Sequence, residues 1–403
     1  MRIAILTQYF IPEMGAPSNR LLELSEKFIE DGWEVLVITA MPNYPEGKIF
    51  EAYAGIFSSE EKIRGIRIKR YWLYASNSPK AIRRIISMIS FSLTSLFSLP
   101  EVKKFRPDFL FAESPPLTLA FSGYILSVIS NAKLIMNVSD IWPLSAKELG
   151  VIGDGFLYRA IEKLEKFIYR KAHLCSGQSE EIISHIEKTV PQEKTYLFRN
   201  GVDVRRFEKA EKNKTGGTGF RIVYAGLTGV AQSILSIVKN INFSGIGAEL
   251  HIFGDGTERK EIEKYISENP GRNVFLHKSR GREEIPGLLK QFDCALIPLV
   301  KNIYGAVPSK IYEAMAAGLP VLFSGTGEGA KIIKENNTGL VSEPGNFVML
   351  KENILKLKDS PELLKEFSQN CIVTAEKKFD RNKLIYDFSG ELRKIINEES
   401  KRN

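Results

Sequence analysis

Short runs of β-branched and aromatic residues alternate along the whole chain with longer stretches that carry apolar residues at helical spacing. This alternation is typical of parallel sheets whose successive strands are connected by helices. In the first half, the expected strands span residues 3–7, 33–39, 109–112, 133–138, 173–176 and 195–198. In the second half, they span residues 221–225, 248–253, 273–277, 294–299 and 320–324. The pattern predicts an α/β fold with two doubly wound, Rossmann-like domains.

A polar, glycine-rich segment at residues 208–219 (EKAEKNKTGGTG) separates the two halves and is typical of a linker. We therefore expect an N-terminal domain at residues 1–207 and a C-terminal domain at residues 220–380. A chain of 403 residues, 43% of them hydrophobic, has enough material for two cores. Three widely spaced cysteines and a start without a signal-peptide pattern favour a reducing cytosol.

Open parallel sheets bind ligands in the loops at the carboxyl ends of their strands. After the first strand, Gly15 permits close backbone approach, Ser18 suits a helix cap, and Arg20 in the first helical turn can meet an anion. The alternative is an ordinary turn followed by a surface arginine.

Three loops of small residues in the second half each lie between an expected strand and an expected helix. They span residues 225–229, 253–257 and 324–329, and they include Gly226, Thr228, Gly254, Gly256 and Glu328. None is a complete dinucleotide fingerprint or a Walker loop, which argues against a dehydrogenase and against a P-loop enzyme.

The clearest signal lies at residues 307–321 (VPSKIYEAMAAGLPV). Ser309 suits the cap of a helix whose first turn holds Lys310, although a cation there opposes the helix dipole. A bound anion would explain that placement. Glu313 lies on the same helical face and can accept hydrogen bonds from a ribose. The alternative is a salt bridge between Lys310 and Glu313 on a solvated face.

Two further carboxylates follow expected strands. Asp140, just before Trp142, can orient a donor sugar or assist deprotonation of an acceptor, or it can simply form a turn or a helix cap. Glu328 can bind donor sugar hydroxyls, or it can complement the dipole of the helix that it begins.

The two α/β halves, the segment from Pro308 to Val321, and Arg199-Asn200-Gly201-Val202-Asp203 with Phe207 together resemble the retaining GT-B glycosyltransferases of family four. The resemblance spans nearly the whole chain. Residues 15–20, 42–47 (PNYPEG) and 140–143 (DIWP) resemble more narrowly the branch that contains N-acetyl-fucosamine transferases of bacterial O-antigen and capsule synthesis.

This resemblance implies a GT-B fold, transfer of a sugar from a nucleotide donor with retention, and a C-terminal helix at residues 381–403 that returns to the first domain. It implies catalytic roles for Lys310, Arg20 and Asp140, in which Lys310 and Arg20 neutralise the leaving diphosphate. The donor-binding residues would be Gly15, Ala16, Gly226, Thr228, Gly254, Gly256, Ser309, Lys310, Glu313 and Glu328. The acceptor-binding residues would be Asn43, Tyr44 and Trp142.

This sequence departs from the family pattern in two places. Glu313 matches the second glutamate of the family's paired motif, but the first would fall at Gly305. The loop after the first strand of the second domain, residues 229–232, carries no lysine or arginine. No motif for a metal is found, and because charge stabilisation by cations suffices for this chemistry, we expect no cofactor and no metal.

A basic window runs from Lys62 to Arg106 and contains no acidic residue between Lys62 and Pro100. Within it, the apolar stretch at residues 85–99 is shorter than the roughly 20 residues that span a bilayer. Its apolar face, flanked by cations such as Lys80, favours a helix lying on an anionic membrane surface. The alternative is a core helix with an exposed serine-rich side.

We therefore expect a cytoplasmic enzyme, peripheral on the inner face of the membrane, with a UDP-sugar donor and a polyprenyl-diphosphate-linked acceptor. The positive charge is not accompanied by a nucleic-acid-binding motif, so nucleic acid is not expected as a partner. The alternatives are a UDP-N-acetylhexosamine 2-epimerase of the same fold and a catalytically silent nucleotide-sugar-binding protein at the membrane.

Overall fold

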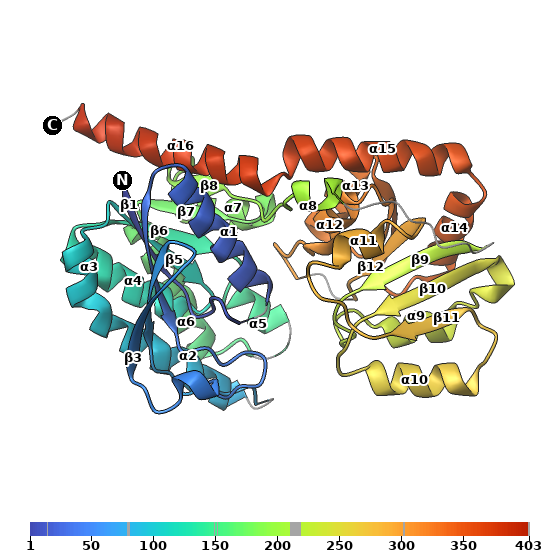
Figure 1. Ribbon diagram of the computed structural model, residues 1–403, viewed down its shortest axis with the longest axis horizontal. Helices are drawn as coiled ribbons and strands as arrows, with labels where there is room; N and C mark the ends of the chain where they lie inside the picture. Colours follow the sequence, from blue (N-terminus) through green and yellow to red (C-terminus); the bar gives the residue numbers. More distant parts are fainter. Residues whose placement is uncertain are drawn as a thin grey trace. The chain divides into compact units, whose positions relative to one another are not determined.

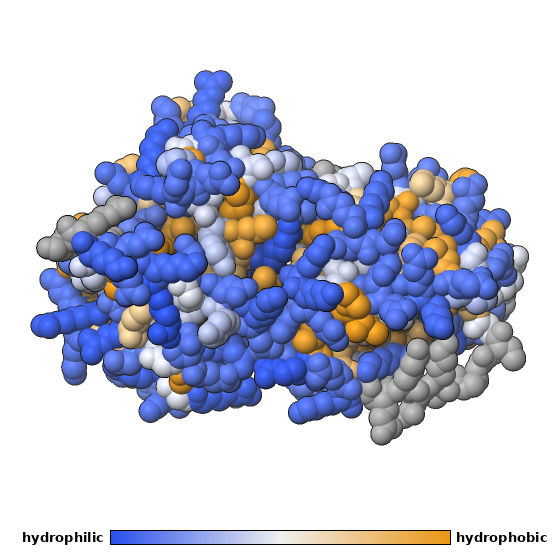
Figure 2. Space-filling view, turned by 90° about the horizontal axis from the view of Figure 1, so that it is seen from above, coloured by the Kyte–Doolittle hydropathy of each residue, from blue (hydrophilic) through white to orange (hydrophobic). Residues whose placement is uncertain are grey.

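The computed structural model describes residues 1–13, 15–78, 81–148, 150, 152–209, 219–300 and 303–401. These residues form two compact units. The first consists of Met1–Arg199 with Asn382–Asn403, and the second of Asn200–Arg381. The face shown in Figure 2 is mostly hydrophilic, with small separate apolar areas, as expected for units that bury their own cores.

The first unit is built on a sheet with strand order β3-β4-β2-β1-β5-β6-β7-β8, parallel except for the pair β3–β4. Figure 1 labels several of its strands and helices. Its strands are β1 (Arg2–Leu6), β2 (Glu34–Ala40), β3 (Ser58–Ile63), β4 (Ile66–Tyr71), β5 (Phe109–Ser114), β6 (Lys133–Val138), β7 (Leu174–Gly177) and β8 (Thr195–Leu197). Its helices are α1 (Ala16–Glu30), η1 (Glu51–Tyr53), α2 (Ala81–Ser95), η2 (Leu96–Ser98), α3 (Leu99–Phe105), α4 (Leu117–Ser130), α5 (Leu144–Glu148), α6 (Phe156–Lys171), α7 (Glu180–Glu187), η3 (Gln192–Lys194) and α16 (Arg381–Ser400).

Alternate residues of these strands point to opposite faces of the sheet, and both faces are covered. Ile3 and Ile5 of β1 belong to a core that includes Phe28 of α1 and Phe388 of α16. On the other face, α4 approaches β5 so closely that a Cβ on Gly123 would lie 2.8 Å from the Cβ of Ala112. Burial on both faces explains why the strands read as continuous apolar runs.

The second unit has a parallel sheet with strand order β11-β10-β9-β12-β13-β14. Its strands are β9 (Phe220–Ala225), β10 (Ala248–Phe253), β11 (Val274–His277), β12 (Cys294–Pro298), β13 (Val321–Ser324) and β14 (Gly339–Ser342). Its helices are α8 (Arg205–Glu208), α9 (Ile234–Asn240), η4 (Ser244–Ile246), α10 (Arg259–Glu268), α11 (Ile285–Leu289), α12 (Lys310–Ala316), α13 (Gly327–Glu335), α14 (Phe347–Lys358) and α15 (Pro361–Lys378). Val223 and Ile222 of β9 belong to separate cores on the two faces.

The division between the units differs from the boundary predicted at residues 207/208, because residues 200–207 pack in the second unit. The Val202 N–H donates to the Phe379 carbonyl oxygen at 2.8 Å, and Phe207 is buried in one of the cores of that unit. Arg381 donates to the carbonyl oxygens of Asn200 and Gly201 at 2.7 and 2.8 Å. Most of the predicted linker, residues 210–218, lies outside the described residues.

Three strands were not predicted. The hairpin β3–β4 carries charged residues on its outward positions, and even a buried position of β4 holds Arg70. The strand β14 is only four residues long and begins with Gly339. In each case an apolar run, the signal used for the other strands, is weak or missing.

Candidate active site

The strand order of the second unit reverses between β9 and β12, where the chain leaves β9 toward β10 on one side and β12 leads to β13 on the other. Such a switch point leaves a crevice at the carboxyl ends of the strands, which is where open α/β sheets bind ligands. The loops after β9, β10 and β12 reach this place. They carry Gly226, Thr228, Gly254, Gly256 and Ser309, five of the ten donor-binding residues predicted above, and the last loop leads into α12.

The two glycine loops after β9 and β10 are joined backbone to backbone. The N–H of Gly226 donates to the Phe253 carbonyl oxygen at 2.8 Å, and the N–H of Thr228 donates to that of Asp255 at 2.9 Å. A Cβ on Gly254 would lie 1.8 Å from the Gly226 oxygen, and one on Gly256 would lie 2.5 Å from the Thr228 oxygen. Glycine is therefore required at both positions by backbone contact.

Lys310 begins α12 and extends across the loop after β9. A Cβ on Gly226 would lie 2.0 Å from Cε of Lys310 and 2.6 Å from its Nζ, so the lysine occupies the space that this glycine leaves. Its Nζ lies 5.9 Å from the centre of the Tyr224 ring. Burial lowers the pKa of Lys310, with Glu313 acting in the opposite direction. An anion bound beside the ammonium would restore the charge that burial disfavours.

Glu313 lies one turn further along α12. Burial raises the pKa of Glu313, and the opposing charges are Lys310, Arg381, Arg206 and Arg282. Within the residues that the structure describes, no ion pair shorter than 4.0 Å joins Lys310 to Glu313, so the salt bridge considered as an alternative is absent. These arginines also face Asp203, Asp380 and Glu283, so Glu313 lies in a network of charges of both signs.

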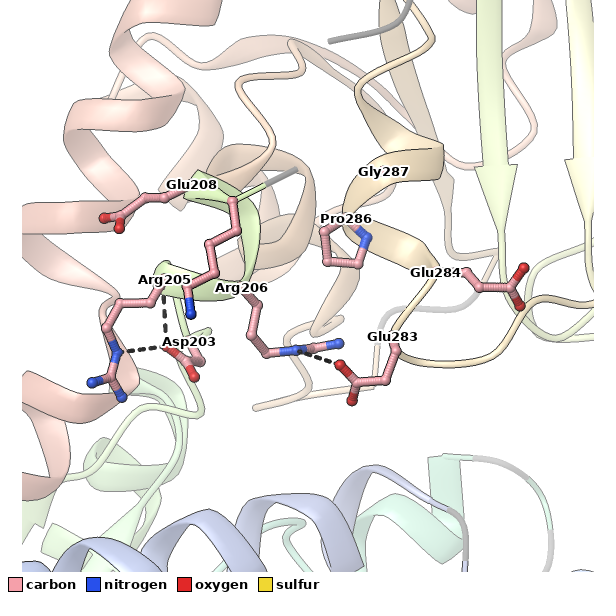
Figure 3. A pocket seen from close by; sticks show the side chains of 9 residues that line it. Asp203, Arg205, Arg206, Glu208, Glu283, Glu284, Pro286 and Gly287 are labelled. Atoms are coloured by element: carbon pink, nitrogen blue, oxygen red, sulfur yellow. Dashed lines mark hydrogen bonds and ion pairs between the residues drawn. The ribbon is translucent and has the colours of Figure 1, made fainter. Parts of the chain in front are cut away.

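A pocket of about 740 Å³ opens between α8 and the start of α11 (Figure 3). Arg206 and Glu283 point toward one another across it, with Nε and Oε2 3.9 Å apart. Arg206 also donates to the carbonyl oxygen of Arg282 at 2.6 Å, and through this contact the pocket adjoins the arginines near Glu313.

Two other predicted residues of this unit, and the position of the missing family glutamate, have mixed outcomes. Ser309 stands at the cap position of α12, but its backbone is already helical and its side chain makes no capping bond, so the predicted cap is wrong. Glu328 is buried in the first turn of α13, a place that fits both of its suggested roles. Gly305, where the family glutamate is missing, has φ near 88°, a backbone conformation that disfavours a glutamate.

In the first unit, the sheet order reverses between β1 and β5, and Arg20 lies at this second switch point. Its guanidinium forms a short ion pair with Glu113, at the end of β5, and donates to Oγ of Ser139 at 3.0 Å. Asn137 donates to the other oxygen of Glu113 at 2.7 Å. The charge of Arg20 is therefore balanced within this unit by Glu113, and its role in neutralising a leaving diphosphate stays a prediction.

The loop after β2 is held by the loop after β1. Oε1 of Glu13 accepts hydrogen bonds from the backbone N–H groups of Asn43 and Tyr44 at 2.8 and 2.9 Å, and from the Asn43 side chain at 3.2 Å. The buried Asn43 side chain is thus used inside the loop, which argues against its predicted contact with an acceptor. Tyr44 is 40% exposed and lies beside Gly15, the N-cap of α1, which begins at Ala16.

Asp140 follows β6 and acts as a local cap, with hydrogen bonds from the Ser145 side chain and the Ile141 backbone. Burial raises the pKa of Asp140. The residue also lines a pocket together with Trp142, as expected for two residues assigned to sugar chemistry. This geometry is therefore compatible with Asp140 as a turn or helix cap, and also with a role of Asp140 in sugar chemistry.

The serine-rich side of α2 faces inward and its apolar side faces outward. Ser87, Ser92 and Ser95 are buried, and the alternative of a core helix with an exposed serine side is wrong. Large apolar side chains on this helix and on η2 are instead 41–72% exposed, namely Ile82, Ile86, Ile89, Leu93 and Phe97. With α3, the helical stretch runs over Ile82–Phe105, so it is longer than predicted and, by length and composition, sufficient to cross a membrane.

Much of the basic window is neutralised by acids from elsewhere in the unit. Arg70 is fully buried and pairs with Glu61, and Lys69 lies 3.3 Å from Glu101. Arg67 pairs with Glu60 and Arg64 with Glu26. Exposed cations remain at Arg83, Arg84, Lys103 and Lys104, whereas Lys80 lies outside the described residues.

Two family models match the chain, and each covers most of one unit. Residues 221–373 match the glycosyl transferases group 1, and residues 15–201 match the glycosyl transferase 4-like domain. Their order along the chain and the two parallel sheets are those of a GT-B enzyme. The chain belongs to the GT-B glycosyltransferases. The expected fold class is thereby confirmed.

Similar proteins agree with this assignment. The glycosyltransferase is 25% identical over 337 residues to the putative colanic acid biosynthesis glycosyl transferase WcaI of Escherichia coli, covering 79% of this chain and 82% of WcaI. Sucrose-phosphate synthase from Thermosynechococcus elongatus has the same fold, with a TM-score of 0.76 at 15% identity over 98% and 99% of the two chains. HepE from Anabaena, solved with UDP-glucose, has a TM-score of 0.69 at 16% identity over 98% and 100%.

The sequence did not indicate several residues that shape these sites in the glycosyltransferase. Arg206, Arg282 and Arg381 come from three distant segments and influence Glu313 only in the folded unit. Glu113 is a buried carboxylate near the end of β5, and Glu13 is a buried carboxylate in the loop after β1. Only for Glu113 was a strand end the available signal. Thr228 was predicted as a donor-binding residue. The sequence did not indicate that its buried Oγ1 has no hydrogen-bond partner in the part of the chain that the structure describes.

Proposed function

We propose that the protein is a retaining, metal-independent glycosyltransferase that uses a UDP-sugar donor. The observation that carries this proposal is the placement of Lys310 at a sheet switch point, packed against Gly226 and one turn from Glu313. The ammonium and the glycine-loop backbones suit a diphosphate, and Glu313 suits ribose hydroxyls. The complex of HepE with UDP-glucose supports the same nucleotide for this fold.

In a front-face reaction, departure of the diphosphate builds negative charge beside the loops after β9 and β12. Lys310 fills the space beside Gly226 in the loop after β9, and it lies in a partly desolvated place where its stabilising effect is larger than in water. With Arg20 occupied by Glu113, we assign neutralisation of the leaving group within this unit to Lys310.

The proposed sugar is an N-acetylated deoxyhexosamine such as N-acetyl-fucosamine, and the proposed acceptor is a polyprenyl-diphosphate-linked sugar of bacterial surface polysaccharide. Support comes from the sequence resemblance and from WcaI, whose name places it in colanic acid biosynthesis. The exposed apolar side of α2 supports a peripheral position on the cytoplasmic face of the membrane.

Titration calorimetry with UDP, without metal, tests the donor site. Lys310→Ala and Glu313→Ala should each weaken UDP binding at least about tenfold, since a hydrogen bond to a charged group contributes about 1.5–3 kcal/mol. Lys264→Ala removes the same charge from a side chain that is 74% exposed on α10 and should bind like the wild type. Equal affinities for all four proteins would disprove the assigned site.

Vesicle flotation tests the membrane surface. Leu93, 61% exposed on α2, should be needed for binding to anionic vesicles, and Leu93→Glu should reduce that binding at least about tenfold because one buried leucine is worth about 1.5–3 kcal/mol. Val348→Glu places the same charge on α14 of the second unit, at a side chain that is 69% exposed, and should have little effect. Unchanged binding of Leu93→Glu would exclude this face.

A further inference from the structure

A second pocket, of about 690 Å³, lies in the first unit at the carboxyl end of β6. We call it the β6 pocket. Its walls come from α2, from the loop that leads into α5, and from the residues before and at the start of α6. The residues that line it are Arg84, Ile85, Met88, Pro115, Asp140, Trp142, Ser145, Ala146, Ile152, Gly153, Asp154, Gly155 and Leu157.

The floor of the β6 pocket has sugar-binding chemistry. Trp142 offers an apolar ring face, on which the C–H groups of a sugar can pack. Asp140 is partly buried and offers carboxylate oxygens that can accept hydrogen bonds from sugar hydroxyls. An aromatic ring beside a carboxylate is a combination that a purely hydrocarbon ligand does not require.

The wall formed by α2 has a different character. Arg84 is exposed and supplies a guanidinium, which can form paired hydrogen bonds with phosphate oxygens. Burial raises the pKa of Tyr9 and the charge of Arg84 acts in the opposite direction, so Arg84 lies toward the carboxyl end of β1. Ile85 and Met88 line the pocket from the same helix, and Leu157 of α6, which is 57% exposed, lines it as well. This part of the pocket suits a hydrocarbon next to an anion.

The apolar wall is continuous with the outer side of the same helix. Ile89 lies four residues after Ile85, one turn along the same side of α2, and Ile86 lies three residues before Ile89; they are 41% and 46% exposed. A chain that leaves the pocket along α2 therefore stays in contact with apolar side chains. Sugar-binding groups, a cation and a hydrocarbon surface thus occur together in one pocket and its rim.

We propose that the β6 pocket binds the acceptor as an amphiphile, with its sugar between Asp140 and Trp142, its diphosphate at Arg84, and its first isoprene units along Ile85, Met88 and Leu157. This inference rests on the proposed function, and it adds a location and an orientation for the lipid-linked acceptor. Arg84 is then the residue that distinguishes a diphosphate-linked acceptor from a free sugar.

Calorimetric titration with farnesyl diphosphate as the probe tests this proposal on the full chain. Arg84→Gln and Leu157→Glu should each weaken binding at least tenfold, and both changes lie at exposed positions that folding tolerates. Each has a neighbour as its matched control, because Arg83 and Phe156 are exposed and do not line the pocket. Arg83→Gln and Phe156→Glu should bind like the wild type.

Equal losses in Arg84→Gln and Arg83→Gln would overturn the proposal, because they would indicate unspecific charge attraction. Loss of farnesyl diphosphate binding in Lys310→Ala would also overturn it, since the probe would then occupy the donor site. If the wild type binds UDP but not farnesyl diphosphate, the proposed function is retained and the β6 pocket is rejected as the acceptor site. A wild type that binds farnesyl diphosphate but not UDP retains the pocket and removes the proposed donor.

Discussion

At the scale of single residues, the site depends on Gly226, because its missing side chain leaves room for the side chain of Lys310. Gly226 has φ near 152°, and the position of its missing Cβ is filled by Cε of Lys310. An alanine there must displace the ammonium from the loop after β9. The residue type at position 226 therefore controls where the charge at position 310 lies.

This coupling gives a testable prediction. Gly226→Ala should weaken UDP binding about as much as Lys310→Ala, and the double variant should be no weaker than either, because both changes remove the same interaction. Gly390→Ala on α16 meets nothing within 4 Å and serves as the control. Additive losses in the double variant, measured by calorimetry, would show that the two residues act separately.

At the scale of elements, β10 and β11 are joined by more than their backbone ladder. Nδ1 of His251 lies 3.1 Å from Nε2 of His277, and the two rings are stacked. His277 also stacks on Phe253, with ring centres 4.2 Å apart. One ring must donate and the other accept, so the contact requires an unprotonated nitrogen. Burial lowers the pKa of both histidines and Arg221 acts in the same direction, whereas the Glu249 carboxylate, 3.1 Å from Nε2 of His251, opposes burial at that ring.

This pair predicts how stability depends on pH. Below the ordinary histidine pKa of about 6.5, the unfolded chain takes up protons that the folded pair resists, so the free energy of unfolding falls as the pH falls. Replacing His277 by Phe keeps the ring stack and should make that fall smaller between pH 7.5 and 5.5. Urea unfolding at the two pH values measures it, and identical slopes in both proteins would contradict the prediction.

At the scale of the whole molecule, the alternating pattern was sufficient to predict two α/β units, because strands buried on both faces must read as apolar runs. It was insufficient for β3 and β4, where Arg70 is buried against Glu61 by a pairing between strands that local sequence does not reveal. The cap and spacing argument predicted Lys310 and Glu313 one turn apart at the start of a helix, and α12 begins at Lys310. Such local arguments could not show that Arg20 would be paired with Glu113, because that contact joins two segments 93 residues apart.

The same limit applies to surfaces. The cations from Lys62 onward read as one basic window, but Glu26, Glu60 and Glu101 approach several of them only after folding. For α2, the spacing of serines and apolar residues was visible in the sequence, whereas the side that faces the core was not. A hydroxyl can face inward because it bonds to a backbone carbonyl, as Ser95 does to Ser92 at 2.8 Å.

The first unit is discontinuous along the chain, because Asn382–Asn403 belongs to it although the second unit comes between. Ile385, Phe388 and Leu392 of α16 are buried in its core, and Ser389 accepts a hydrogen bond from Trp33 at 2.8 Å. In Figure 1, α16 lies beside α1, in agreement with the contact between Phe388 and Phe28. The two ends of the second unit, in contrast, meet where Val202 pairs with Asp380.

The two units should therefore differ in whether they fold when each is expressed as a separate fragment. A fragment comprising residues 200–381 keeps every strand of its sheet and both partners of its closing bridge, so it should fold alone and bind UDP with the affinity of the full chain. A fragment ending at residue 199 lacks a helix of its own core and should be recovered folded only when residues 382–403 are supplied, fused or as a peptide. Circular dichroism and calorimetry on the fragments decide this, and a stable 1–199 fragment would show that α16 is dispensable.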